Sequence, residues 1–148
     1  MTAEIQQCST CKDVPESEYV ARCADTAYSA VAAGDGEVTI RIVDREEGTE
    51  LNRKYRNGDR ATNVLSFTYA NDPNVPAGTL GDVVICAPVV REEASTQEKD
   101  VKAHWAHMVA HGILHLCGYD HEEEEAARTM EALETDILST LGFSDPYD

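Results

Sequence analysis

Residues 101–121 read VKAHWAHMVAHGILHLCGYDH. This stretch predicts a long helix from about Asp100 to Cys117, which ends at Gly118 because glycine is favoured just beyond a helix C-terminus. Four histidines recur within the helix at spacings of three, four and four residues, so we expect all four imidazoles on one side of it. They are His104, His107, His111 and His115.

Helix geometry limits which of these imidazoles can bind one metal ion together. A helix rises about 1.5 Å per residue, so His107 and His115 are separated by roughly 12 Å along the axis. His111 and His115 have the i, i+4 spacing of helical zinc sites, and a sharp turn at Gly118 can bring His121 to the same point. We therefore expect these three histidines to bind one metal ion, whereas the two earlier ones support the site or face solvent.

The ligand set indicates the metal and the class of chemistry. Three neutral imidazoles leave one position of a tetrahedral zinc ion open, as in catalytic zinc sites. We expect one Zn²⁺ per chain, although other divalent ions also accept three imidazoles. The span from His111 to His121 has the spacing of the metzincin protease motif, but Gly112 stands where that motif has its catalytic glutamate. This difference disfavours a protease, and the spacing disfavours the alternative of ordinary surface histidines.

The remaining sequence predicts helices mixed with short strands. Helices are expected over residues 15–34, 44–55 and 88–95 and from about residue 122 onward, and strands over residues 37–43, 64–67 and 82–86. Asp44 and Glu47 have the spacing of a capping box at the start of the second helix. Because the chain shows no internal repeat or linker, we expect one α/β (α+β) domain over residues 1–148, with a small sheet covered by helices.

The charge distribution bears on the partners. A net charge of −16 argues against indiscriminate binding of nucleic acid, because phosphate contacts dominate that affinity. However, six of the twelve basic residues fall between positions 41 and 60, so a local basic surface is retained. They are Arg41, Arg45, Arg53, Lys54, Arg56 and Arg60.

Cysteine use and hydropathy bear on the compartment. The five cysteines form an odd set, and the N-terminus does not have the pattern of a secretory signal, so we expect reduced thiols in the cytoplasm. Cys8 and Cys11 are not followed by a second such pair, which disfavours a metal or redox role for them. No apolar run approaches the roughly 20 residues of a membrane-spanning helix, and we expect no membrane partner.

The stretch HGILHLCGYDH, from His111 to His121, resembles the metal-binding motif of the YbeY family. Three further segments resemble conserved blocks of that family, namely LNRKYR at residues 51–56, TNVLSF at 62–67 and LGDVVIC at 80–86. Residues 130–134 and 142–147 are also similar to proteobacterial members. The resemblance covers nearly the whole chain except the first dozen residues, where only Ile5 strongly favours a strand.

The resemblance implies a mixed four-stranded sheet with about five helices and one zinc ion on His111, His115 and His121. It also implies a single-strand-specific endoribonuclease that matures the 3′ end of small-subunit ribosomal RNA and acts in ribosome quality control. The functionally important arginine of the family falls on Arg56, whose planar donors suit a phosphodiester. Arg56 and His111 are accordingly the expected catalytic residues, and ribosomal RNA, small-subunit ribosomal proteins or an assembly GTPase are the expected partners.

Two other functions remain open at this point. The first is a non-catalytic ribosome-assembly factor with a structural zinc, whose fourth ligand would come from the protein. The second is a small-molecule metallohydrolase, for which the basic stretch also favours a phosphate substrate. Asp120 and Glu122 flank His121, but acids are common at helix starts, so neither is assigned as a general base.

Overall fold

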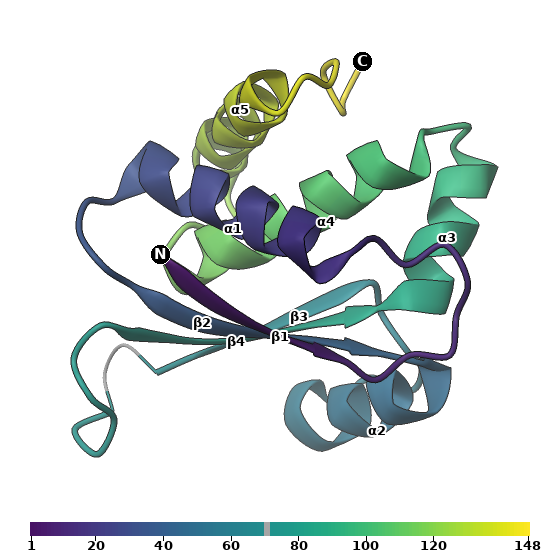
Figure 1. Cartoon of the computed structure of the whole chain (residues 1–148), viewed down its shortest axis with the longest axis horizontal. Coiled ribbons are helices and arrows are strands. Elements are labelled where there is room, and N and C mark those ends of the chain that lie inside the picture. Colours follow the sequence, from purple (N-terminus) through teal and green to yellow (C-terminus); the bar gives the residue numbers. More distant parts are fainter. Residues whose placement is uncertain (70–71) are drawn as a thin grey trace.

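A mixed sheet forms the middle of the protein (Figure 1). The computed structural model describes residues 1–69 and 72–148. The strands are β1 (Thr2–Gln7), β2 (Glu37–Val43), β3 (Val64–Thr68) and β4 (Thr79–Cys86). They lie in the order β1-β2-β4-β3, in which β1, β2 and β4 are parallel and β3 is antiparallel to β4. The expected four-stranded mixed sheet is confirmed.

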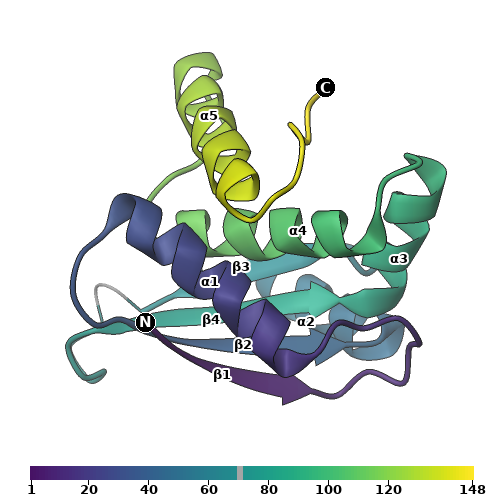
Figure 2. The same ribbon diagram turned by 45° about the horizontal axis from the view of Figure 1, so that its top comes forward.

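Helices cover the two faces of this sheet unequally. The described part of the chain forms α1 (Ser17–Val31), α2 (Arg45–Arg56), α3 (Ala87–Thr96), α4 (Val101–Leu116) and α5 (Glu124–Thr140). α1 and α4 cover one face, α2 lies alone on the other, and α5 crosses over α1 and α4 as an outer layer (Figures 1 and 2). The expected single α/β domain is confirmed. None of the helices in the described ranges is long and apolar enough to cross a membrane.

The N-terminal strand depends on a partner rather than on its own composition. β1 pairs in parallel with β2, from Thr2 opposite Glu37 to Gln7 opposite Ile42. Ala3 and Ile5 pack against the core, whereas Glu4 between them is exposed. A strand with a single strong strand former is therefore stabilised by tertiary pairing, which local sequence does not reveal.

Three expectations about helix starts are corrected. α1 begins at Ser17, so Pro15 precedes the helix, and α5 begins at Glu124, so Glu122 lies before its first turn. Asp44 is the N-cap of α2 but makes no capping bond, because its carboxylate accepts hydrogen bonds from the loop before α1, at Ser9 and Thr10. Glu47 pairs with Arg41 instead of completing a capping box.

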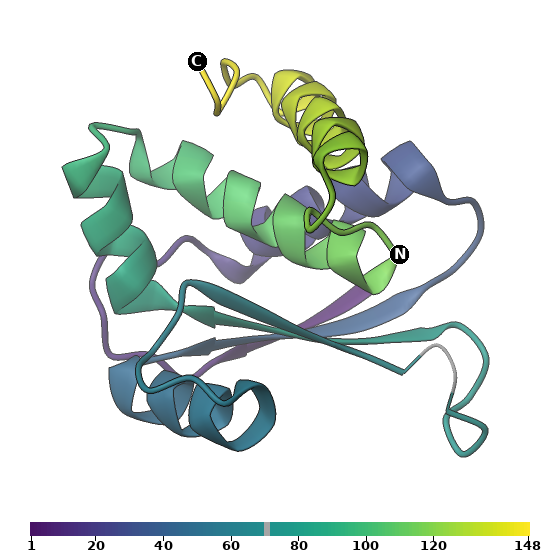
Figure 3. The same cartoon turned by 180° about the vertical axis from the view of Figure 1, so that it is seen from behind.

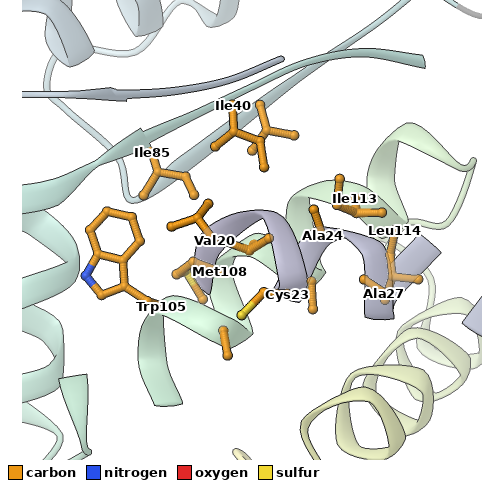
Figure 4. Close-up of a cluster of buried hydrophobic side chains, with 14 of the residues drawn as sticks. Val20, Cys23, Ala24, Ala27, Ile40, Ile85, Trp105, Met108, Ile113 and Leu114 are labelled. Atoms are coloured by element: carbon orange, nitrogen blue, oxygen red, sulfur yellow. The ribbon is translucent and has the colours of Figure 1, made fainter. Parts of the chain in front are cut away.

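The main core lies between the sheet and the helix pair α1 and α4. Figure 4 shows Val20 of α1, Ile40 of β2, Ile85 of β4 and Trp105 of α4 meeting in this layer, and each is at most 1% exposed. Burying one such large side chain contributes about 1.5–3 kcal/mol to folding, so this layer fixes α4 on the sheet. α4 thereby becomes a rigid carrier for the side chains on its outer face.

Gly112 explains why α4 lies so close to the sheet. A Cβ atom on Gly112 would lie 2.7 Å from Val83 Cγ1, which is closer than packed carbon atoms tolerate. The Gly112 carbonyl also accepts a hydrogen bond from Ser66 Oγ of β3 at 3.1 Å. The position that carries a glutamate in metzincins therefore faces the sheet, and only glycine fits it without displacement.

Candidate metal centre

The predicted histidine trio converges at the C-terminal end of α4. His111 and His115 are one turn apart on the helix, and their Nε2 atoms lie 3.0 Å from each other. The His121 ring centroid lies 5.3 Å from that of His111 and 5.2 Å from that of His115. One nitrogen atom of each ring falls within 4.8 Å of the others, so the three residues could hold one metal ion.

The turn after α4 brings the third histidine into place. Gly118 has φ +98°, a left-handed conformation that favours glycine. Its N–H donates to the His115 carbonyl at 3.1 Å, and the Tyr119 N–H donates to the Leu114 carbonyl at 3.1 Å. This pair of bonds is a Schellman motif, which ends the helix and reverses the chain (Figure 3). The expected role of Gly118 is confirmed.

The surroundings of His115 favour the neutral form of its ring, which is the form that binds metals. Burial, followed by the neighbouring His111 and His121, lowers the pKa of His115. A metal ligand must be a neutral imidazole, so a lowered pKa extends metal binding to lower pH. His121 is exposed and His111 is partly exposed, so the site is open on one side.

A buried carboxylate lies behind His111. Glu134 of α5 is 1% exposed, and its Oε2 atom lies 2.5 Å from His107 Nε2 and 3.4 Å from His111 Nδ1. The Tyr147 hydroxyl donates to Glu134 Oε1 at 2.8 Å. When the His111 Nδ1–H faces Glu134, the lone pair on Nε2 faces the other two ligands, which is how outer carboxylates orient metal-binding histidines.

The charge of Glu134 fits a cation at this position. Burial raises the pKa of Glu134, but hydrogen bonds with His107 and His111 lower it more strongly, to about 2. Within the described ranges its ion-pair partners are these two histidines alone, without a lysine or arginine. A buried ionised carboxylate is costly without positive charge nearby, and a divalent ion on the histidine trio would supply it. The donor set and its surroundings therefore fit the expected metal.

Sequence reasoning missed Glu134, although one signal was present. The buried residues of α5 are Met130, Glu134, Ile137 and Leu138, so the glutamate occupies a position on the apolar stripe of an amphipathic helix. An acid on such a stripe indicates a buried partner, but the sequence does not say which one.

The two earlier histidines are buried and do not join the trio. His107 is 7% exposed and contacts Glu134, which agrees with a supporting role. His104 is 4% exposed and lies 2.9 Å from Glu93 Oε1, and burial lowers its pKa. Glu93 in turn accepts hydrogen bonds from Asn63 at 3.1 and 3.2 Å, next to the histidine trio.

A cleft of about 390 Å³ opens in front of the trio. It is lined by the three histidines, by Arg56, and by β3 with the loop before it, including Thr62, Asn63, Ser66 and Thr68. Among the residues that the structure describes, no carboxylate lines this cleft, so Asp120 and Glu122 do not reach it. We name this space the metal cleft.

Arg56 is held at the rim of the metal cleft by two contacts. Its Nη2 donates to the Ser66 carbonyl at 2.6 Å, and its guanidinium carbon lies 4.8 Å from the centre of the Phe67 ring. A further donor reaches the Tyr55 carbonyl at 3.2 Å. A guanidinium has five N–H donors, so several remain for a ligand in the cleft.

The basic stretch around Arg56 is only partly neutralised. Arg41 pairs with Glu47, and Arg45 pairs with Glu92. The other four members have no acidic partner within residues 1–69 and 72–148, and they lie on the last turns of α2 and the loop that follows. They are Arg53, Lys54, Arg56 and Arg60. Of these four, Arg56 lines the metal cleft, so a positive charge is present there on a strongly acidic chain.

Comparison with known proteins extends the likeness to nearly the whole chain. The sequence model of the family described as Endoribonuclease YbeY matches residues 4–142. A protein of that name from Cellvibrio japonicus is 49% identical over 145 residues, covering 98% of this chain and 82% of the relative. Its namesake from Alcanivorax borkumensis is 48% identical over 152 aligned residues, covering 99% of this chain and 86% of the relative.

Similarity also extends to a solved structure. The solution structure of a protein from Thermotoga maritima superposes with a TM-score of 0.60 at 26% sequence identity. The match covers 97% of this chain and 99% of the other chain. The two chains therefore share their whole fold.

Proposed function

The chain belongs to the YbeY family of endoribonucleases, and from this membership we propose that it is a zinc-dependent, single-strand-specific endoribonuclease of ribosomal RNA processing. Its natural reaction is the maturation of the 3′ end of small-subunit ribosomal RNA in the cytoplasm, with a role in ribosome quality control. The observation that carries this proposal is the metal cleft, a space of about 390 Å³ that is lined by both the three-imidazole site and Arg56.

The histidine trio holds the metal ion in this proposal. His111, His115 and His121 provide three neutral nitrogen ligands, and Glu134 fixes the orientation of His111. When bound, the ion supplies a Lewis acid that lowers the pKa of water and stabilises negative charge at phosphorus. Among the described residues, no further histidine, cysteine or acid joins the trio as a fourth ligand. This favours a catalytic site over a closed structural one.

Arg56 binds the scissile phosphodiester in this proposal. Its contacts with Ser66 and Phe67 hold the guanidinium in one orientation before substrate arrives, which lowers the entropic cost of binding. Its remaining donors pair with phosphate oxygens and stabilise the charge that develops on them. Because Glu134 lies behind His111, it orients that ring and does not contact the substrate.

The acidic remainder of the chain shapes the choice of partners. A protein with net charge −16 binds free RNA weakly, so we propose that small-subunit ribosomal proteins or an assembly GTPase add affinity on the ribosome. The exposed acids at the start of α5 suit a basic ribosomal protein.

The test compares enzyme with scaffold in the native cell. The protein is depleted, ribosomal RNA ends are mapped, and the cell is complemented with wild type or with His111→Ala. Rescue by wild type alone is expected. Equal rescue by both would show that the ligand is dispensable and would replace the enzyme with a non-catalytic assembly factor.

A further inference from the structure

Edge strand β3 has a second cavity on its other side. Along β3 the side chains alternate, so that Ser66 and Thr68 line the metal cleft, whereas Phe67 faces α2. Between α2 and the exposed face of the sheet lies a groove of about 450 Å³. Strand β3 therefore separates the two cavities.

This groove has an aromatic end and a polar end. The aromatic end is formed by Tyr55, Phe67 and Tyr69, with Leu51 and Val84 as the apolar floor. The polar end is formed by Asp82, the Arg41–Glu47 ion pair, Gln6 and Thr39. We name this space the aromatic groove.

The aromatic end includes the ring of Tyr55, which lies largely outside the hydrophobic core. Tyr55 is 51% exposed, and its ring meets the Phe67 ring edge-on, with centroids 5.4 Å apart and an angle of 69°. In the described part of the chain, only Tyr55 and Tyr147 are large hydrophobic residues with such exposure, and Tyr147 is bonded to Glu134. Among the described contacts, the Tyr55 hydroxyl makes no hydrogen bond like the one that the Tyr147 hydroxyl makes.

Arg56 connects the aromatic groove with the metal cleft. It lines the metal cleft, and its guanidinium lies over the Phe67 ring that lines the aromatic groove. Tyr55 precedes it in the chain and lies at the rim of the groove. A ligand held at Arg56 therefore has a direct path around the edge of β3 into the groove.

The charges of the groove determine which part of a nucleotide it accepts. Arg41 is neutralised by Glu47, and the Asp82 carboxylate accepts a hydrogen bond from the Tyr69 hydroxyl at 2.5 Å, which raises the pKa of Tyr69 to about 12. Among the described residues, the polar end therefore offers no unpaired cation to a phosphate. The Asp82 carboxylate would repel a phosphate. A neutral, flat base with N–H groups on its edge suits both the aromatic walls and this acceptor.

We propose that the aromatic groove binds one unstacked nucleobase of a single-stranded RNA whose neighbouring phosphate lies at Arg56. This subsite rests on the proposed function and adds a reason for its single-strand specificity. A base can enter the groove only when it has left its stack and its pairing partner, and duplex RNA does not supply such a base. Phosphates stay outside the groove, because its arginine is paired with Glu47 and its Asp82 carboxylate repels them.

The test uses short single-stranded RNA that contains 2-aminopurine, with metal-loaded protein. The 2-aminopurine is flanked by abasic nucleotides, so it has no stacked neighbour in the free RNA, and stacking on an aromatic side chain should then quench its fluorescence on binding to wild type. Tyr55→Ala should weaken RNA binding about tenfold and reduce the quenching, while metal content and the circular dichroism spectrum stay unchanged. Tyr55→Phe keeps the ring and should behave like wild type. Cleavage by Tyr55→Ala should show a raised KM with little change in kcat.

Two outcomes distinguish failure of this subsite from failure of the proposed function. If wild type cleaves RNA and Tyr55→Ala shows the same quenching and the same KM, the groove does not bind a base and the nuclease stands. If wild type cleaves no RNA, the nuclease fails, and fluorescence quenching still decides whether the groove takes a base. A series of RNAs, each with one abasic nucleotide at a different position, gives a further test. If every RNA of the series binds with the affinity of the intact RNA, the proposal is overturned.

Discussion

The two faces of the sheet are built for different tasks. On the face covered by α1 and α4, large side chains such as Trp105 and Ile113 are fully buried, and α4, which carries His111 and His115, packs tightly on the sheet. On the face covered by α2, a small buried cluster of Val43, Leu65 and Cys86 leaves the aromatic groove open beside it. The first face fixes His111 and His115 on a tightly packed helix, whereas the second leaves aromatic side chains lining an open groove.

This comparison predicts that substitutions at the strand edge separate substrate binding from metal binding. Arg56→Glu replaces a phosphate donor with a repelling charge, so we expect RNA cleavage to fall by at least about a hundredfold. Metal content should stay at the wild-type value, because Arg56 contacts Ser66 and Phe67 and none of the histidines. The measurements are cleavage rate over a range of salt concentrations and elemental analysis. Unchanged rates would return Arg56 to the role of a surface residue.

On the rigid face, Glu134→Gln should act on the metal rather than on the RNA. The amide keeps the size of the side chain but loses the negative charge that orients His111, so we expect metal affinity to fall about 10- to 100-fold. Tyr147→Phe is the matched control, since it removes one hydrogen bond to Glu134 and keeps the carboxylate, and it should have a smaller effect. Competition with a chelator gives both affinities. Equal affinities for wild type and Glu134→Gln would remove the carboxylate from the metal site.

A pair of glycines tests the packing difference between the two faces. Gly112→Ala places a Cβ atom 2.7 Å from the buried Val83, so we expect a loss of about 1–3 kcal/mol in the free energy of unfolding. Gly48→Ala in α2 places its Cβ atom 3.3 Å from Ala61 Cβ, in a loop that can adjust, and alanine favours the helix. We expect Gly48→Ala to be neutral or stabilising. Urea unfolding measures both, and equal losses would contradict the difference in packing.

The smallest expected effect is a dependence of stability on pH in the metal-free protein. The folded pKa of Glu134, about 2, lies below the ordinary glutamate value of 4.5, so the folded state favours the ionised form. Its contribution is fully present above about pH 4.5 and is lost as pH falls toward 2. Wild type should therefore lose more stability than Glu134→Gln between pH 5 and pH 3, about the range in which an unfolded glutamate titrates. Parallel curves for the two proteins would contradict this assignment.

The sequence predicted that the three histidines converge, because the determinants are local. His111, His115 and His121 lie within one helix and one turn, so helical spacing and Gly118 are sufficient to bring them together. The supporting residues Glu134 and Tyr147 come from α5 and the C-terminal tail, and their approach depends on how α5 packs on α4. No periodic pattern specifies that packing.

The strand-edge features show the same distinction between local and distant determinants. The functional role of Arg56 was predicted from the family resemblance, because an arginine at the end of a helix is ordinary on its own. Its contact with Ser66, ten residues later, requires the pairing of β3 with β4. β1 and the corrected role of Asp44 have the same cause, since Asp44 bonds to Ser9 and Thr10 from a loop far away in sequence.

The central claim is that the histidine trio binds the metal on which RNA cleavage depends. The direct measurement is metal content and cleavage of single-stranded RNA by His115→Ala, with His104→Ala as the matched control on the same helix. His115→Ala, folded by circular dichroism, should lose its metal and its activity, whereas His104→Ala should keep one metal ion per chain. Full metal content at neutral pH in folded His115→Ala, with cleavage at the wild-type rate, would contradict the account.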